Sequence, residues 1–216
     1  MQQTRARQAR RILAHRGLWK AAHEQNTPKA IQRAINAGYG VELDIRDRHG
    51  DLVVSHDPAC NEAPQWEDLD TILATCMSHV ALNIKSDGLA PMLKGISAMY
   101  PGTFAFDMSW PQTLDYIDQG ISVALRASEY ESAPPSLFRR LGIPCRIWLD
   151  SFHEDWWLEN LDLREWPPPL SVFVVSPEIH GRDPSAAWKW VHSSIQKGID
   201  VFLCTDYCAD ALEAIS

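Results

Sequence analysis

The feature that most constrains this chain is a series of short apolar segments, each of strand length, separated by segments with helical periodicity. Eight such apolar runs occur, and some are almost continuous, as in SVFVVS at residues 171–176. Runs of this kind are typical of strands that are covered on both faces by other structure. The predicted strands are Ile12–Arg16, Tyr39–Arg46, Val80–Lys85, Thr103–Met108, Ser122–Ser128, Cys145–Asp150, Ser171–Ser176 and Val201–Thr205. The alternation predicts an α/β fold with a parallel sheet.

The segments between these strands carry helix signals. In the stretch TPKAIQRAINAG, Thr27 is a predicted N-cap, Pro28 occupies the first helical position and Gly38 ends the helix. The segment after the second strand breaks the alternation, because RHGDLVVSHD at residues 48–57 has a turn signal at His49-Gly50-Asp51. It predicts a β-hairpin inserted after the second strand.

Eight strands alternating with helices fit either a closed (β/α)8 barrel or an open doubly wound sheet. The open sheet usually has a glycine-rich loop after its first strand, whereas HRGLWK at residues 15–20 contains one glycine. The strand number and the missing loop favour a compact TIM barrel. We therefore expect residues 1–216 to form a single barrel domain with a small hairpin insertion after strand 2.

Charge and composition exclude several classes of protein. The formal net charge of -8 leaves no basic surplus for neutralising nucleic-acid phosphates, so we expect no nucleic-acid partner. Arginines are frequent near the N-terminus, but the apolar run Ile12–Ala14 is too short for a signal peptide, and no run approaches the length of a membrane span. The five cysteines form no CxxC pair and fit reduced thiols. The expected location is the cytoplasm.

The second predicted strand carries two carboxylates inside an apolar run. Glu42 and Asp44 alternate with apolar residues, so their side chains point to the same face. Two carboxylates about 7 Å apart on one face repel each other unless a positive charge lies between them. One interpretation is an edge strand with its polar face toward solvent. The other is a strand that faces a cation.

Polar groups also occur where each predicted strand ends, which is the end at which barrel enzymes carry their active sites. These groups are His15-Arg16, Glu42-Asp44, Asn83-Lys85, Asp107, Arg126-Glu129, Asp150, Glu178-His180 and Asp206. A simple alternative, in which side chains reach solvent where loops begin, stays open for the aspartates. It explains Glu42 less well, because Glu42 lies within its strand.

Four motifs in the N-terminal quarter give a more specific indication. They are AHRG at residues 14–17, a Glu/Asn-Thr element at residues 24–27, VELDI at residues 41–45 and DLVVSHD at residues 51–57. In this order and spacing they resemble the glycerophosphodiester phosphodiesterase family, which is related to the phosphatidylinositol-specific phospholipases C. The resemblance implies a (β/α)8 barrel, one divalent cation such as Mg²⁺ or Ca²⁺, and hydrolysis of a small-molecule phosphodiester. A glycerophosphodiester is the family default, and a sugar or nucleotide diester is equally compatible with these residues.

The resemblance also assigns roles in the chemistry. It implies that His15 and His56 are the catalytic acid and base, and that Arg16 and Lys85 bind the phosphate. In-line attack on phosphorus needs a base on one side and an acid on the other, and imidazole can take either role near neutral pH. Arginine can hold a phosphate through its planar fork, whereas lysine adds a point charge.

The implied metal ligands are Glu42, Asp44 and Asn83. Carboxylate and amide oxygens are the ligands that hard divalent cations prefer. Asn83 departs from the family, in which this position is usually Glu, so we expect weaker cation binding and consider Asp107 and Glu129 as compensating ligands. This departure motivates an alternative function: a degenerate barrel that binds a phosphorylated ligand without turnover. The presence of both histidines argues against it, because a binding module needs neither.

Other residues are candidates for supporting roles. Glu24 and Asn26 lie near the first loop and are candidates for contacts behind the metal ligands. His180 is a candidate pocket residue after the seventh strand, and Trp19 is a candidate pocket wall.

Overall fold

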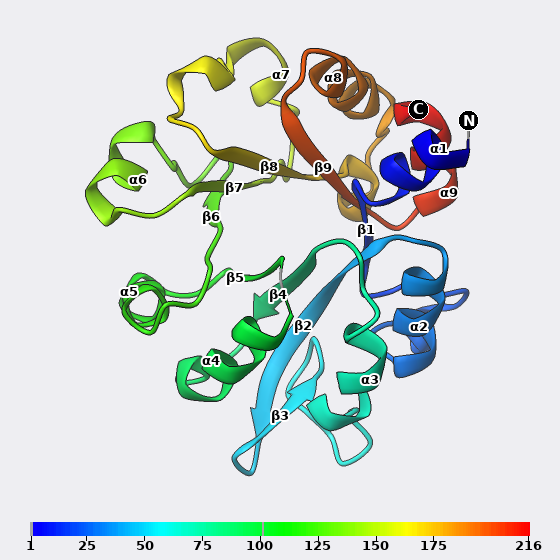
Figure 1. Cartoon of the computed structure of the whole chain (residues 1–216), viewed down its shortest axis with the longest axis vertical. Coiled ribbons are helices and arrows are strands. Elements are labelled where there is room, and N and C mark those ends of the chain that lie inside the picture. Colours follow the sequence, from blue (N-terminus) through cyan, green and yellow to red (C-terminus); the bar gives the residue numbers. More distant parts are fainter. Residues whose placement is uncertain (1, 101) are drawn as a thin grey trace. The chain divides into compact units, whose positions relative to one another are not determined.

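The computed structural model describes residues 2–100 and 102–216. The chain divides into two compact units, unit 1 at residues 1–123 and unit 2 at residues 124–216. Each unit consists of strands that alternate with helices (Figure 1). The strands that the structure describes in each unit run parallel, apart from one hairpin strand in unit 1.

Unit 1 contains a sheet with the strand order β5-β4-β2-β1, in which β3 pairs only with β2. Its strands are β1 (Ile12–His15), β2 (Gly40–Arg48), β3 (Asp51–Val54), β4 (Val80–Ile84) and β5 (Thr103–Phe106). Its helices are α1 (Gln2–Ala9), α2 (Pro28–Asn36), α3 (Asp70–Leu73), α4 (Ala90–Met99) and α5 (Trp110–Asp118), with 3-10 turns η1 (Ala22–Glu24) and η2 (Trp66–Asp68). Figure 1 shows α2 and α3 lying next to each other, with α4 on the other side of β2 in this view.

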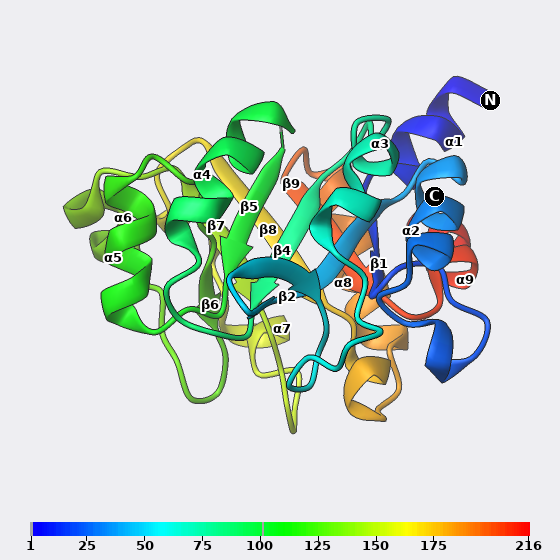
Figure 2. The same cartoon turned by 90° about the horizontal axis from the view of Figure 1, so that it is seen from below.

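Unit 2 contains four parallel strands in the order β9-β8-β7-β6. These strands are β6 (Leu125–Ala127), β7 (Cys145–Leu149), β8 (Leu170–Val175) and β9 (Asp200–Thr205). The helices are α6 (Pro135–Leu141), α7 (Trp157–Asn160), α8 (Ser185–Gln196) and α9 (Cys208–Ile215), with 3-10 turns η3 (Leu163–Glu165) and η4 (Pro177–His180). Figure 2 shows α8 and β9 lying alongside each other, as the chain order requires.

The local signals in the sequence explain these elements. Thr27 caps α2 by accepting a hydrogen bond from the Ala30 N–H at 3.3 Å, and Pro28 opens the helix. Apolar strand residues supply the core of each unit, including Leu43 of β2 and Phe173 of β8, both 0% exposed. Burying such side chains contributes about 1.5–3 kcal/mol each relative to leaving them exposed. Continuous apolar strands are therefore what stabilise both sheets.

All eight predicted parallel strands are present, with ends that differ from the prediction by three residues at most. The largest difference is the segment predicted at Ser122–Ser128, where the regular strand is Leu125–Ala127. Val123 instead forms an isolated bridge with Ala105. The predicted hairpin after the second strand is confirmed as β2–β3. No helix in residues 2–100 or 102–216 is long and apolar enough to cross a membrane.

The hairpin determines where the chain goes after the carboxylate strand. Strand β2 continues past Asp44 to Arg48, and β3 returns antiparallel to it with Ile45 opposite Val54. The next residue, Ser55, donates its backbone N–H to the Asp44 carbonyl at 3.0 Å. The hairpin thus returns the chain to Asp44 immediately before His56.

Candidate active site

The parallel register of unit 1 places the predicted site residues next to one another. His15 of β1 is aligned with Glu42 of β2, and Asp44 of β2 is aligned with Asn83 of β4. His15 ends β1 and Asn83 lies one residue before the end of β4, whereas Glu42 and Asp44 lie within the longer β2, and Lys85 follows β4 directly. The sequence therefore gathers basic, acidic and amide side chains at one edge of this sheet.

The His15-Arg16-Gly17 turn needs its glycine for steric reasons. Arg16 and Gly17 both have left-handed backbone conformations, with φ values of 56° and 83°. A Cβ atom at Gly17 would lie 2.8 Å from the Ala30 carbonyl carbon, which is closer than real Cβ contacts. Only glycine allows the start of α2 to approach this turn so closely. This turn directs the Arg16 side chain back toward β2, and Arg16 Nε lies 2.8 Å from Asp44 Oδ2.

Asp44 is fully buried and is surrounded by positive charge and a polar amide. Lys85 Nζ lies 3.3 Å from Asp44 Oδ1. Asn26, itself in a left-handed conformation with φ 59°, donates from Nδ2 to Asp44 Oδ2 at 2.8 Å, and its Oδ1 accepts from the Asp44 N–H at 3.3 Å. Two cations and one amide therefore surround this carboxylate and fix its orientation.

Glu42 lies in the opposite electrostatic situation. Burial and the neighbouring charge of Asp44 raise the pKa of Glu42 to about 7, and the positive charges of His15, Arg16 and Lys85 only partly oppose this. His15 Nε2 lies 3.9 Å from Glu42 Oε2, and the Arg16 backbone N–H donates to the same oxygen at 3.2 Å. A further positive charge near Glu42 would favour its ionised form.

The oxygen atoms of this site fit a hard divalent cation. Asn83 Oδ1 is buried and accepts no hydrogen bond, whereas the buried Asp44 Oδ1 lies 3.3 Å from the Lys85 ammonium. A buried acceptor without a donor is costly unless another partner satisfies it, and a cation is such a partner. In residues 2–100 and 102–216 there is no cluster of three or more His, Cys, Asp or Glu side chains arranged for a metal.

His56 lies on the exposed side of the hairpin. Its ring Nδ1 is 2.9 Å from Asp57 Oδ1, and its side chain is 48% exposed. Its backbone carbonyl accepts a hydrogen bond from Arg46 Nε at 3.0 Å. The structure thus brings His15, Arg16 and Lys85 against the carboxylates, while the His56 ring pairs with Asp57.

Two other candidates have structural roles that the sequence did not indicate. Glu24 accepts hydrogen bonds from the Arg33 guanidinium at 2.6 Å and from the Lys20 N–H at 2.8 Å, and these contacts lower its pKa to about 2. It fixes the first loop to α2, whereas Asn26 contacts Asp44 directly. Glu129 accepts hydrogen bonds from three backbone N–H groups within unit 2, so its oxygens hold a loop.

Sequence reasoning missed Gln25, whose Oε1 accepts a hydrogen bond from Arg16 Nη1 at 3.2 Å. The sequence signal that could have identified Gln25 is its position between Glu24 and Asn26, within the motif at residues 24–27. Trp19, a predicted pocket wall, donates from Nε1 to the His15 carbonyl at 3.1 Å and so lies against the turn.

No family model and no curated protein sequence matches this chain. Solved structures do match. A glycerophosphodiester phosphodiesterase from Agrobacterium tumefaciens has a TM-score of 0.66 at 18% identity, with 95% of this chain and 99% of that chain covered. A second one, from Parabacteroides distasonis, has a TM-score of 0.63 at 18% identity, with 94% and 95% covered. The chain has the fold of the glycerophosphodiester phosphodiesterases.

A phosphodiesterase from Oleispira antarctica, in complex with the product sn-glycerol-3-phosphate, also matches this fold. Its TM-score is 0.64 at 15% identity, with 94% of this chain and 96% of that chain covered. The likeness confirms the predicted (β/α)8 barrel and agrees with the resemblance that the motifs gave.

Proposed function

We propose that this chain is a metal-dependent phosphoric diester hydrolase that cleaves a glycerophosphodiester-like phosphodiester by histidine general acid/base catalysis. The observation that carries this proposal is the contact set of Glu42 and Asp44, two buried carboxylates bordered by His15, Arg16 and Lys85. The fold shared with two glycerophosphodiester phosphodiesterases and a third phosphodiesterase supports it.

Arg16 and Lys85 are the proposed phosphate contacts. Both are partly exposed, with side-chain exposures of 20% and 21%, although both contact the fully buried Asp44. A cation with a buried counter-ion keeps its position, and its remaining N–H groups can donate to an anion from solvent. A phosphodiester carries one negative charge, which these two groups can neutralise.

Glu42, Asp44 and Asn83 are the proposed ligands of one divalent cation, Mg²⁺ or Ca²⁺. When bound, such an ion neutralises charge on the non-bridging phosphate oxygens. The buried acceptor oxygen without a hydrogen bond, Asn83 Oδ1, favours this assignment. The raised pKa of Glu42 agrees with it, because that carboxylate lacks sufficient positive charge in the protein alone.

His15 and His56 are the proposed proton-transfer pair. Each has a carboxylate beside it, Glu42 at 3.9 Å from His15 and Asp57 at 2.9 Å from His56. A neighbouring carboxylate stabilises the imidazolium that forms when a histidine accepts a proton. One histidine would remove the proton of the attacking water, and the other would protonate the leaving alcohol.

The test is hydrolysis of a panel of phosphodiesters, including glycerophosphodiesters and bis(4-nitrophenyl) phosphate. Purified protein is stripped with a chelator and then assayed alone and with Mg²⁺, Ca²⁺ or Mn²⁺. We expect turnover of at least one diester that disappears in the chelator and returns with a divalent cation. Turnover that is identical with and without the chelator would contradict the cation assignment.

The second candidate function is a degenerate barrel that binds a phosphorylated ligand without turnover. Asn83 favours it, because one negative ligand fewer weakens cation binding. Calorimetry with the same diesters separates the two functions. Binding of a diester without turnover under any cation would select the binding function.

A further inference from the structure

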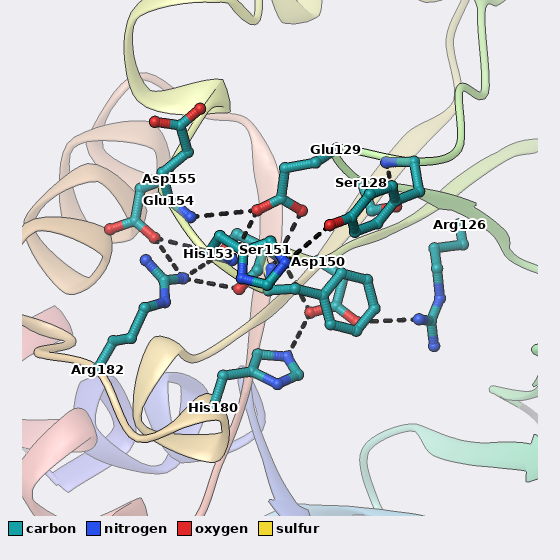
Figure 3. A network of polar contacts seen from close by, with 12 residues as sticks. Arg126, Ser128, Glu129, Asp150, Ser151, His153, Glu154, Asp155, His180 and Arg182 are labelled. Atoms are coloured by element: carbon teal, nitrogen blue, oxygen red, sulfur yellow. Dashed lines mark hydrogen bonds and ion pairs between the residues drawn. The ribbon is translucent and has the colours of Figure 1, made fainter.

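Unit 2 contains a second polar cluster, which the proposed function does not use. Figure 3 shows Arg126, Asp150 and His180 meeting at the Asp150 carboxylate, with Glu129, Ser151 and Arg182 nearby. The three meeting residues come from the ends of three different parallel strands: Arg126 from β6, Asp150 just after β7 and His180 from the turn after β8. In this fold class, the loops at the carboxyl ends of strands carry function.

Asp150 fixes two partly exposed side chains. It is 3% exposed, and its Oδ1 lies 2.8 Å from His180 Nε2 while its Oδ2 lies 3.3 Å from Arg126 Nη1. The partners remain accessible, with side-chain exposures of 19% for Arg126 and 22% for His180. A buried carboxylate of this kind contributes little to stability, because its desolvation offsets its attraction for the cations. We therefore explain the buried Asp150 by its effect on Arg126 and His180, because it orients these two partly exposed side chains.

An aromatic surface adjoins these groups. The Arg126 guanidinium lies over the Phe152 ring at 5.4 Å from its centroid, and the His180 ring lies 5.0 Å from the same ring. Tyr130 lies 5.9 Å from Phe152 and is 71% exposed, and its hydroxyl is 2.7 Å from His153 Nε2. Large exposed aromatic side chains next to polar groups are typical of binding surfaces.

The loops that carry these rings are fixed in advance. Glu129 accepts hydrogen bonds from the N–H groups of Phe152, His153 and Glu154 at 2.9–3.2 Å. Ser128 Oγ accepts from the Tyr130 N–H at 3.2 Å. Such support keeps side chains in one geometry, which lowers the entropy lost when a ligand binds.

Charge decides which class of ligand fits. The two arginines near this surface, Arg126 and Arg182, are outnumbered by seven carboxylates in these loops, which belong to Glu129, Glu131, Asp150, Glu154, Asp155, Glu178 and Asp183. An anionic ligand would be repelled by this excess of negative charge. A cationic ligand would compete with Arg126, which already covers the Phe152 ring. A neutral ligand is therefore favoured.

We propose that the loops after β6, β7 and β8 form a carbohydrate-binding surface for a neutral sugar. A sugar presents polarised C–H groups, which the negative face of an aromatic ring such as Tyr130 attracts. It also presents neighbouring hydroxyls that both donate and accept. Arg126 can donate hydrogen bonds to these hydroxyls, and Glu131, whose side chain is 57% exposed, can accept hydrogen bonds from them. The His180 ring can do either, so the surface offers both donors and acceptors to a sugar.

The test measures binding of neutral methyl glycosides and short oligosaccharides by ligand-observed NMR, in protein carrying His15→Ala. That background removes the proposed turnover, so the result does not depend on the phosphodiesterase proposal. Tyr130→Ser should weaken binding by about tenfold or more, because it removes the ring, whereas Tyr130→Phe should stay within about threefold of the parent. Trp110→Ser in unit 1, which removes another aromatic ring that is 51% exposed, should leave binding unchanged.

Hydrogen exchange should show that a bound sugar protects the amides of residues 128–131 and 150–154, and thermal melting should show that each variant is folded. No binding of any sugar in the panel at tens of millimolar, or equal binding by a folded Tyr130→Ser variant, would overturn the proposal. A sugar phosphate that bound these loops more tightly than the corresponding neutral sugar would overturn the charge argument on which it rests.

Discussion

Two acidic side chains, Glu42 of unit 1 and Glu129 of unit 2, occupy opposite electrostatic environments. Burial and the charge of Asp44 raise the pKa of Glu42 to about 7. Glu129 also loses solvation, but hydrogen bonds from the backbone N–H groups of residues 152–154 dominate and lower its pKa to about 2. One environment disfavours the charged carboxylate and the other favours it.

The two carboxylates differ in their neighbours, because Glu42 lies beside the negative charge of Asp44 and Glu129 lies among backbone N–H donors. The oxygens of Glu129 are satisfied by backbone donors of a loop, so its charge serves to hold that loop. On the strand beside β2, the buried Asn83 Oδ1 accepts no hydrogen bond. An external cation gains most where oxygens are buried and unsatisfied. This contrast is why we place cation binding in unit 1 and loop support in unit 2.

The largest expected effect concerns the histidines beside the carboxylates of unit 1. His15→Ala or His56→Ala should lower turnover of bis(4-nitrophenyl) phosphate by about 10²–10⁴-fold, because each removes a proton-transfer group. Binding of a diester should survive, since Arg16 and Lys85 remain. His49→Asn is the matched control, because His49 lies at the exposed tip of the same hairpin with φ 54°, a conformation that Asn tolerates. Full activity in both alanine variants would show that these roles are wrong.

A stability comparison isolates the close contact at Gly17. Gly17→Ala and Gly181→Ala both put alanine in a left-handed conformation, at φ 83° and 74°. Only the first also places a Cβ 2.8 Å from backbone, because nothing lies within 4 Å of the Cβ position at Gly181. We expect Gly181→Ala to lower the free energy of unfolding by about 1 kcal/mol and Gly17→Ala by about 2–4 kcal/mol, measured by urea denaturation. Equal losses would mean that the turn can move away from α2 at no cost.

The proposed cation site can be tested by adding a negative charge at Asn83. Asn83→Glu adds a carboxylate beside the acceptor oxygens, so cation affinity measured by calorimetry should rise by about tenfold. Without the cation, the same variant should be less stable than the parent, because it adds a third buried acidic group. Asn36→Glu is the control, since it makes the same charge change at an exposed position of α2. Unchanged affinity in Asn83→Glu would exclude Asn83 from the site.

The smallest expected effect concerns the pH dependence of Glu129. Its pKa is depressed from 4.5 to about 2, so its contribution to stability is present above about pH 4.5 and is lost as the pH falls toward 2. After allowance for solvent screening at this partly exposed group, we expect Glu129→Gln to cost about 1–2 kcal/mol at pH 7. The difference from the parent should shrink between pH 4.5 and pH 3 in urea titrations. Glu154→Gln, an exposed change in the same loop, should show no such pH-dependent difference.

The strands could be predicted because their signals are local. A run such as VELDI needs no long-range information to be identified as a buried strand. The alternation of such runs with helices then indicates that the strands run parallel. The motif residues at strand ends were likewise visible in the sequence, and the contact of Asn26 with Asp44 agrees with its predicted place behind the metal ligands.

The remaining contacts depend on the tertiary structure. Glu129 was a candidate metal ligand because it is a carboxylate at a strand end, but sequence does not show that three N–H groups from the loop after β7 reach it. The meeting of Arg126 and His180 at Asp150 similarly requires three strand ends at once. The roles of the histidines and of the cation ligands, and the single-domain assignment, stay predictions.

The β2–β3 hairpin has a consequence for engineering. Its two arms leave and rejoin the sheet at neighbouring residues, since Ile45 pairs with Val54 and Ser55 bonds to Asp44. The tip at His49 and Gly50 is exposed, and nothing lies within 4 Å of the Cβ position at Gly50. A fluorophore, an affinity peptide or an immobilisation linker inserted at this tip would extend into solvent without moving Asp44. The tip is thus a place where this protein can be anchored to a surface with its candidate site intact.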